Sequence, residues 1–224
     1  MNGPQVTVLN RIRIMKTDML QNVNLFTYEN RCYAEGARFV CGLDEAGRGP
    51  LFGDVFAAAV IFEKGFIPDG EINDSKKLSA RQRERLYDVI ISEALACAVA
   101  SAGVDEIESM NILEASLLAM RRAVKRLDIT PDVLLVDGGG VMARGFDCRA
   151  IPIVGGDGSS VSIAAASILA KVSRDRYMLD MADMYPEYGL DRNKGYGTRE
   201  HAEALRKYGP TPLHRMSFLS KILI

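Results

Sequence analysis

The sequence is poor in the residues that build zinc sites and disulfide frameworks. It holds only two histidines, His201 and His214, so a zinc site based on histidine is hard to assemble. The four cysteines are widely spaced and form no CxxC motif. This spacing argues against a disulfide framework and against a zinc ribbon, and it fits a reducing cytosol.

The chain also lacks a long apolar run. No apolar stretch approaches the roughly 20 residues needed to span a bilayer, and the start of the sequence lacks the basic-then-apolar order of a secretory signal. We therefore expect a soluble, cytoplasmic protein with no membrane partner. A chain of 224 residues, 48% of them hydrophobic, can bury one core, so a single domain is the default. Residues 1–22 show no clear periodicity and are predicted to form an extension of unknown role.

Excess positive charge is absent too, since the formal net charge is -1. A balanced charge argues against a nucleic-acid partner, because phosphate backbones favour a basic surface, but clustering can override the total. For any one basic cluster, a solvated helix face is the simpler interpretation. The clusters are Lys76-Lys77, Arg81/Arg83/Arg85, Arg121-Arg122 with Lys125-Arg126, and Lys171/Arg174/Arg176.

Several common catalytic motifs are missing. The sequence has no G-x-S-x-G elbow, no G-x-x-x-x-G-K-[ST] loop and no EF-hand spacing. The glycine-rich segment 47–53 misses G-x-G-x-x-G by one position, and no helical pattern follows it. Serine hydrolase, P-loop and dinucleotide-binding chemistry are therefore disfavoured.

Short apolar segments separated by glycine-rich turns predict strands. Residues 38–43 and 55–62 are apolar and partly β-branched, with the segment 47–53 as a turn between them. In residues 97–103, Cys97, Val99 and Ser101 alternate with alanines, which suits a further strand. Two more apolar runs, 133–136 and 150–154, each end in glycine-rich loops, as buried strands do.

Helical patterns follow or alternate with these strands. Ser79 with Gln82 forms a capping-box pattern that predicts a helix over about 80–93. Asn111 with Glu114 forms a second one, before apolar residues spaced by three and four. A stretch rich in small residues, 163–184, predicts a third helix. This order of elements predicts an α/β fold with a mixed sheet.

Four carboxylates follow or end the predicted strands. Asp44 and Glu45 come after one strand, Asp137 ends another, and Asp157 lies between a strand and a helix. Taken singly, each is most simply a helix cap, a turn residue or a surface charge. Together at neighbouring strand ends they would repel one another unless a cation neutralised them. Such all-oxygen ligands favour Mg²⁺ or Mn²⁺ over zinc.

Eight segments, in order along the chain, resemble the sequence blocks of bacterial ribonuclease HII, the type 2 ribonuclease H. They are GLDEAGRGP (42–50), NDSKKL (73–78), NIL (111–113), VDG (136–138), GD (156–157), AASILAKV (165–172), KGY (194–196) and HRMSF (214–218). The resemblance implies a ribonuclease H-like fold over residues 23–224, with a mixed central β-sheet flanked by helices and a C-terminal helical segment.

The resemblance also implies an activity: hydrolysis of RNA in RNA/DNA hybrids, and nicking of duplex DNA 5′ of single embedded ribonucleotides. It implies that Asp44, Glu45, Asp137 and Asp157 are the catalytic, metal-binding carboxylates. It implies that Gly47, Arg48, Gly49 and Tyr196 bind the ribonucleotide at its junction with DNA. We expect a monomer.

The sequence departs from the family pattern at four positions. Gly155 replaces a lysine that the family usually has, Asp54 stands where proline is frequent, and Gly139-Gly140 lie in a loop that is often bulkier. These departures bear on substrate affinity. Type 3 enzymes, which resemble this chain less, carry glutamate at the position of Asp157 and a longer N-terminal domain.

The expected mechanism uses two metal ions, one to activate a water and one to stabilise the departing 3′ oxygen, leaving a 3′-hydroxyl and a 5′-phosphate. Lys76, Lys77, Lys171 and Arg174 are candidates for contacts with flanking phosphates, and surface or helix-end roles stay open for each. The competing hypotheses are another ribonuclease H-like nuclease, a metal-dependent phosphatase, and an inactive hybrid-binding protein.

Overall fold

A five-stranded mixed β-sheet forms the centre of the computed structural model, which describes residues 25–67, 72 and 78–221. The strand order is β3-β2-β1-β4-β5. The strands are β1 (Val40–Ala46), β2 (Val55–Ile61), β3 (Ala96–Ala102), β4 (Val133–Asp137) and β5 (Arg149–Ile153). The extension proposed at residues 1–22 lies outside the described residues, as do Lys76 and Lys77.

The sheet combines both directions of pairing. β1 runs antiparallel to β2 and parallel to β4, while β2 and β3 are antiparallel and β4 and β5 are parallel. In the β1–β4 register Leu43 lies opposite Val136. The next residues along each strand, Asp44 and Asp137, therefore emerge at the same edge of the sheet.

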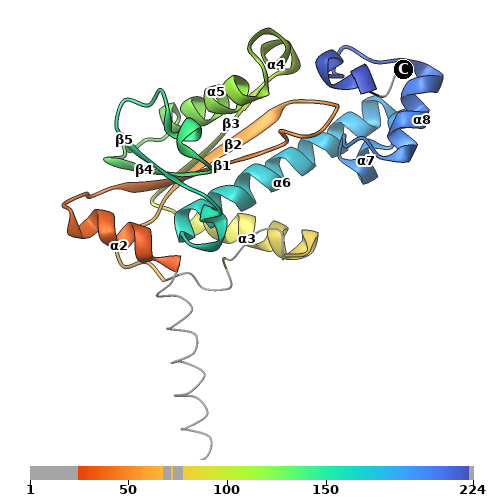
Figure 1. The fold of residues 1–224 in the computed structure, drawn as a ribbon. Coiled ribbons are helices and arrows are strands. Elements are labelled where there is room, and N and C mark those ends of the chain that lie inside the picture. Colours follow the sequence, from red (N-terminus) through yellow and green to blue (C-terminus); the bar gives the residue numbers. More distant parts are fainter. Residues whose placement is uncertain (1–24, 68–71, 73–77, 222–224) are drawn as a thin grey trace, which may run out of the picture.

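Helices cover both faces of the sheet (Figure 1). On one face α5 (Ile112–Lys125) packs against β2 and β3, next to α4 (Val104–Met110). On the other face α6 (Val161–Met184) packs against β1 and β2 and contacts α3 (Ala80–Glu93). The helices predicted around 80–93, after Asn111 and over 163–184 are thus confirmed, and so is the α/β fold with a mixed sheet.

The C-terminal part of α6 extends beyond the sheet and carries the C-terminal helical segment (Figure 1). This segment contains α7 (Leu190–Asn193) and α8 (Arg199–Tyr208) and has a small hydrophobic core of its own around Phe52, Tyr188 and Leu205. At the other end of the sheet α2 (Thr27–Ala34) packs beside β1. The 3-10 turns are η2 (Gly140–Ala143), η3 (Gly156–Gly158), η4 (Pro186–Tyr188) and η5 (Met216–Lys221).

Helix α6 lies unusually close to β1 because both elements carry small residues there. Ala164, Ala165 and Ala166 are fully buried. A Cβ atom added at Gly42 would lie 2.1 Å from the backbone carbon of Ser162. The backbone of the strand and that of the helix are therefore in direct contact, which leaves no room for a side chain at position 42.

One expected boundary is wrong. The sequence placed Asp44 and Glu45 after the strand, but β1 continues to Ala46, with Asp44 opposite Ala58 and Glu45 opposite Ala57 in β2. The reason is that a strand is held by backbone hydrogen bonds, which polar residues donate and accept as well as apolar ones do. The two carboxylates consequently stand on a rigid strand and not on a loop.

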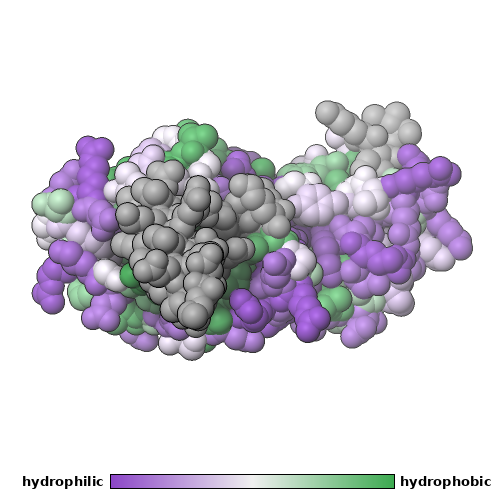
Figure 2. Space-filling view, turned by 90° about the horizontal axis from the view of Figure 1, so that it is seen from below, coloured by the Kyte–Doolittle hydropathy of each residue, from purple (hydrophilic) through white to green (hydrophobic). Residues whose placement is uncertain are grey.

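The surface seen from below is mainly hydrophilic towards the end where α7 and α8 lie, with hydrophobic residues scattered among polar ones (Figure 2). Within the ranges the structure describes, no helix has both the length and the apolar character required to cross a bilayer.

Candidate active site

A cavity of about 320 Å³ opens at the edge of the sheet where β1 and β4 end together. Asp44, Glu45 and Asp137 all line it, so the structure brings together three of the four carboxylates singled out from the sequence. The other lining residues come from the loop after β1, from α3, from α6 and from the C-terminal segment. They are Ala46, Gly47, Arg83, Ser167, Lys171, Arg174 and Tyr196.

The three carboxylates destabilise one another in their charged forms. Asp44 is 5% exposed, and burial, followed by the charges of Glu45 and Asp137, raises the pKa of Asp44 well above its ordinary value. Burial also raises the pKa of Glu45, and Asp137 adds to this, while Arg48 opposes it. A buried cluster of one sign of charge is the arrangement that a bound cation would stabilise.

Two neighbours partly offset this repulsion. The hydroxyl of Ser167 on α6 and the backbone N–H of Glu45, at 2.7 Å, hydrogen-bond to the Asp44 carboxylate. Arg48 Nη1 lies 3.2 Å from Glu45 Oε1. The second oxygen, Glu45 Oε2, is buried and has no hydrogen-bond partner among the described residues. This oxygen is an unused acceptor at the cavity wall.

Asp157 differs from the other three carboxylates in that it does not line the cavity. It lies in η3, is 5% exposed and is not among the residues that line the cavity. The turn is nevertheless tied to the site, because the backbone N–H of Gly156 donates to Asp137 Oδ1 at 2.7 Å. Asp157 thus follows directly on a residue that contacts the site.

The donor set fits a divalent metal ion in chemistry more than in present geometry. In residues 25–67, 72 and 78–221, no three or more His, Cys, Asp or Glu side chains converge closely enough to hold an ion. The unused Glu45 Oε2 and the mutual repulsion of Asp44, Glu45 and Asp137 are both features that a hard cation with oxygen ligands would satisfy.

The glycine-rich segment 47–53 borders this cavity. Gly47 has φ +99, and a Cβ atom there would lie 2.2 Å from Arg174 Nε, so only glycine fits. At Gly49 the backbone is outside the left-handed region, and a Cβ atom would meet only Tyr196 Cε1, at 3.6 Å. Tyr196 is 47% exposed, so its ring is available to a ligand beside Gly49.

Two buried arginines hold this segment in place. Arg215 is fully buried and donates to the backbone oxygens of Gly47 (2.8 Å), Arg48 (3.0 Å), Pro50 (2.9 Å) and Gly53 (2.6 and 2.8 Å). Sequence reasoning gave Arg215 no role. Arg215 belongs to the segment HRMSF (214–218), but nothing in the sequence indicates that a residue so far along the chain reaches these oxygens.

Arg174 is the second. The sequence suggested that it contacts phosphates, but it is 1% exposed and its guanidinium donates to three backbone oxygens. These belong to Asp54 (3.3 Å), Lys194 (2.9 Å) and Phe52 (3.1 Å). These three bonds join the glycine-rich segment to the turn before Tyr196, so Arg174 has a structural role that the sequence did not indicate. Arg174 also lines the cavity and has five N–H donors, so its contact with a phosphate stays a prediction.

Three further polar residues, Lys171, Arg83 and Ser167, line the cavity. Lys171 lines it and forms an ion pair with Asp175 at 2.5 Å. Arg83 on α3, which the sequence placed only in a basic cluster, lines it as well. Ser167 was also missed, because a serine in an alanine-rich helix is most simply a packing residue.

Comparisons with known proteins agree with one another. A family model described as "Ribonuclease HII" matches residues 41–221. A ribonuclease HII of Caldicellulosiruptor bescii is 50% identical over 203 residues, which cover 91% of this chain and 97% of that protein. A ribonuclease HII of Ruegeria pomeroyi is 54% identical over 185 residues, covering 83% and 78%. The crystal structure of the ribonuclease H2 from Pyrococcus horikoshii superposes with a TM-score of 0.70 at 26% identity, covering 83% of this chain and 97% of that one.

Proposed function

This chain belongs to the ribonuclease HII family and is an endoribonuclease H of type 2, and we propose that it nicks duplex DNA 5′ of a single embedded ribonucleotide by divalent-metal catalysis. The family accounts for hydrolysis of RNA in RNA/DNA hybrids. The proposal adds the single-ribonucleotide substrate, the 3′-hydroxyl and 5′-phosphate products, and the roles of individual residues. We expect the enzyme to act as a monomer.

One observation carries the proposal: Gly49 lies next to the exposed ring of Tyr196, at the border of the cavity that Tyr196 lines together with the three carboxylates. Gly49 has no side chain, and the nearest atom of Tyr196 is 3.6 Å from the place a Cβ atom would take. The main chain of residues 47–49 can therefore approach one ribose closely, while the ring of Tyr196 stacks on its sugar or base. A 2′-hydroxyl both donates and accepts hydrogen bonds, so one ribose suffices for recognition.

The carboxylates supply the ligands. Asp44, Glu45 and Asp137 would hold Mg²⁺ or Mn²⁺, with Asp157 joining from η3. The bound metal ions supply a nucleophilic water and stabilise the charge that develops on the leaving oxygen. Ser167 and the backbone of Glu45 orient the Asp44 carboxylate. Lys171 would contribute positive charge near the phosphates that flank the scissile bond when its ammonium exchanges Asp175 for a phosphate.

Three competing functions make different predictions in one assay. An inactive hybrid-binding protein would retain a labelled hybrid uncut, a phosphatase would release terminal phosphate only, and a type 3 activity would cut hybrids but leave single embedded ribonucleotides intact. We expect cleavage of both substrates in Mg²⁺ or Mn²⁺ and none after EDTA.

The sharpest test is Gly49→Ala. A methyl group at position 49 would lie 3.6 Å from the ring of Tyr196, where the ribose is expected to bind, and it causes no backbone strain. Nicking at a single ribonucleotide should therefore fall by at least about tenfold, equal to about 1.4 kcal/mol. The melting temperature should stay within a few degrees of that of the wild type. The measurement is the nicking rate of end-labelled duplexes that differ in one 2′-hydroxyl.

Ser92→Ala is the control, because Ser92 is exposed near the end of α3 and does not line the cavity. It should leave both rate and stability unchanged. Equal nicking of DNA with and without the ribonucleotide, or cleavage only where several ribonucleotides run together, would contradict the proposal.

A further inference from the structure

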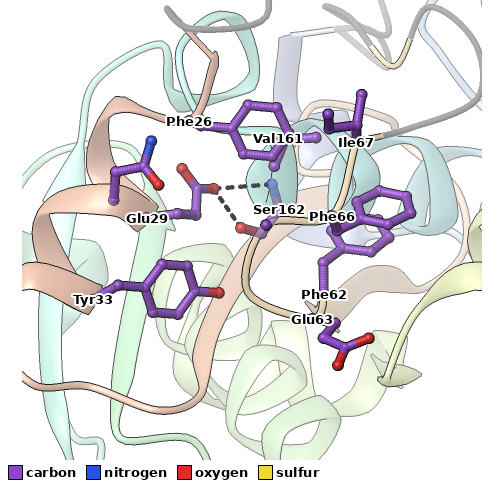
Figure 3. Close-up of a pocket in the computed structure, with 11 residues that line it drawn as sticks. Phe26, Glu29, Tyr33, Phe62, Glu63, Phe66, Ile67, Val161 and Ser162 are labelled. Carbon is purple, nitrogen blue, oxygen red and sulfur yellow. Dashed lines mark hydrogen bonds between the residues drawn. The ribbon is translucent and has the colours of Figure 1, made fainter.

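A second cavity, of about 250 Å³, lies away from the carboxylate site, between α2, the segment that follows β2, and the first turn of α6 (Figure 3). None of its lining residues lines the candidate active site. It is therefore a cavity separate from the candidate active site.

The walls of this cavity are mainly aromatic and aliphatic. The rings of Phe62 and Phe66 stack with centroids 4.2 Å apart and an interplanar angle of 6°. Phe26 and Val161 add to the wall, and Ile67 stands near them at the rim with 72% of its surface exposed (Figure 3). Such walls bind a flat apolar group through its faces.

Glu29 places a carboxylate into this apolar surrounding. It is 3% exposed, and its Oε1 accepts hydrogen bonds from the Ser160 hydroxyl at 2.6 Å, the Ser162 backbone N–H at 3.1 Å and the Ser162 hydroxyl. Its other oxygen, Oε2, is buried and has no hydrogen-bond partner among the described residues. Figure 3 shows the carboxylate directed into the cavity. An unmatched buried carboxylate oxygen is costly, so the cavity contains an acceptor that lacks a donor.

The charge of the lining is of one sign. Glu29 and Glu63 both contribute to it, and no described lining residue is Lys, Arg or His. The nearby Lys64 ammonium lies over the ring of Tyr33, 5.6 Å from its centroid, and Lys64 does not line the cavity. A ligand with a positive charge would therefore match both the carboxylates and the faces of the aromatic rings.

We propose that this cavity is a binding site for a small organic cation, an amine or amidine carried on a flat apolar body. One N–H of the cation donates to Glu29 Oε2, and the body lies against Phe66 and Phe62. The volume suits a single ring with its cationic group. A bare metal ion fits less well, because the apolar walls offer it no further oxygen ligands.

Occupancy would also stabilise α6, because Glu29 binds the first turn of that helix through Ser160 and Ser162. An additional partner on Oε2 strengthens the same carboxylate link. We expect the full-length protein to melt at a higher temperature when the ligand is present, in proportion to its concentration over the dissociation constant.

The test is titration of the full chain with benzamidine, followed by NMR shift perturbation and by the melting temperature. Benzamidine should perturb residues of α2 and of the first turn of α6, and neutral benzyl alcohol should bind at least about tenfold more weakly. Glu29→Gln keeps the shape of the side chain and removes its charge, so benzamidine affinity should fall by about tenfold or more. Glu187→Gln, at an exposed position that does not line the cavity, is the matched control and should change affinity less than about threefold.

Because Glu29→Gln also weakens the cap of α6, Phe66→Ala provides a second variant. Phe66 is only partly buried, and its removal takes away one wall without touching the carboxylate. It should fold normally and bind benzamidine at least about fivefold more weakly. The proposal is overturned if benzamidine does not bind, if both variants bind it like the wild type, if the neutral analogue binds equally well, or if Asp44→Asn abolishes binding, which would place the cation in the carboxylate cavity.

Discussion

Asp137 is the residue on which the candidate active site depends most visibly, since it ends β4, lines the cavity and accepts the hydrogen bond that ties η3 to the site. Asp137→Asn removes its charge and keeps an oxygen that the Gly156 N–H can reach. We expect the cleavage rate in Mg²⁺ to fall by at least about 100-fold, because a lost metal ligand is worth several kcal/mol in the transition state. A labelled-hybrid assay measures the rate.

Circular dichroism and thermal melting provide the control for this variant: the spectrum should match that of the wild type, and the melting temperature should be equal or higher, because one of three repelling charges is removed. Wild-type turnover by a folded Asp137→Asn variant in Mg²⁺ would show that Asp137 is not a metal ligand.

At this scale the sequence predicted which carboxylates lie together better than it predicted the residues that support them. Asp44, Glu45 and Asp137 could be brought together because each lies at the end of a predicted strand, and neighbouring strands end at one edge of the sheet. Arg215 could not, because its partners are backbone oxygens, which every residue has and no motif marks. The backbone contacts of Arg174 could not be predicted for a related reason, since burial of a guanidinium depends on the fold and not on neighbours in the chain.

Among the elements, the segment 47–53 depends on Arg215 in a way that can be tested. A lysine ammonium has three donors on one atom and cannot reach four backbone oxygens that a planar guanidinium spans. Arg215→Lys should lower the free energy of unfolding by about 3 kcal/mol, as loss of a buried charged network does. Urea denaturation measures it.

The same variant should reduce the rate of nicking at a single ribonucleotide more than cleavage of a continuous hybrid, because the segment that meets the ribose is loosened. Arg199→Lys is the matched control, since the Arg199 side chain is 92% exposed and its ion pair with Glu203 is a surface one. Equal stability of Arg215→Lys and Arg199→Lys would contradict this account.

The elements were predictable where their apolar residues recur with a helical period, as in α3 and α5, or form an unbroken run, as in β2 and β4. The capping residues of the two helices, Ser79 and Asn111, were identified correctly. Helix α2 was not expected, since Glu29 and Cys32 are its only buried residues and they give no apolar stripe. Strand β1 was predicted too short because its last residues are polar.

For the molecule as a whole, the stability should depend on pH through a buried histidine pair. His201 in α8 and His214 in the stretch between α8 and η5 lie with their Nε2 atoms 3.1 Å apart. Burial lowers the pKa of both, and His201 helps to lower that of His214 to about 4, while Thr211 opposes the shift. In the unfolded chain each takes up a proton near pH 6.5.

The direction of this pH dependence follows from the difference in proton uptake between the unfolded and the native chain. Between about pH 6.5 and about pH 4 the unfolded chain binds protons that the native pair does not, so stability is present above pH 6.5 and is lost as the pH falls through this window. Glu200, the one charge that raises the pKa of His201, reduces the effect. The free energy of unfolding in urea should therefore fall more steeply over this range for the wild type than for His214→Asn, whose oxygen can still accept from the Thr211 N–H. Parallel slopes would contradict the assignment.

The contact between Gly42 and α6 bears on how a library of random variants of this protein should be interpreted. Every substitution at position 42 places an atom against the backbone of Ser162, so all of them should score as inactive, as substitutions of Asp44 should. Two positions apart in the chain, an intolerant packing site and an intolerant chemical site would look identical in an activity screen. Only a parallel measurement of protein abundance separates them: abundance should collapse at position 42 and persist at position 44.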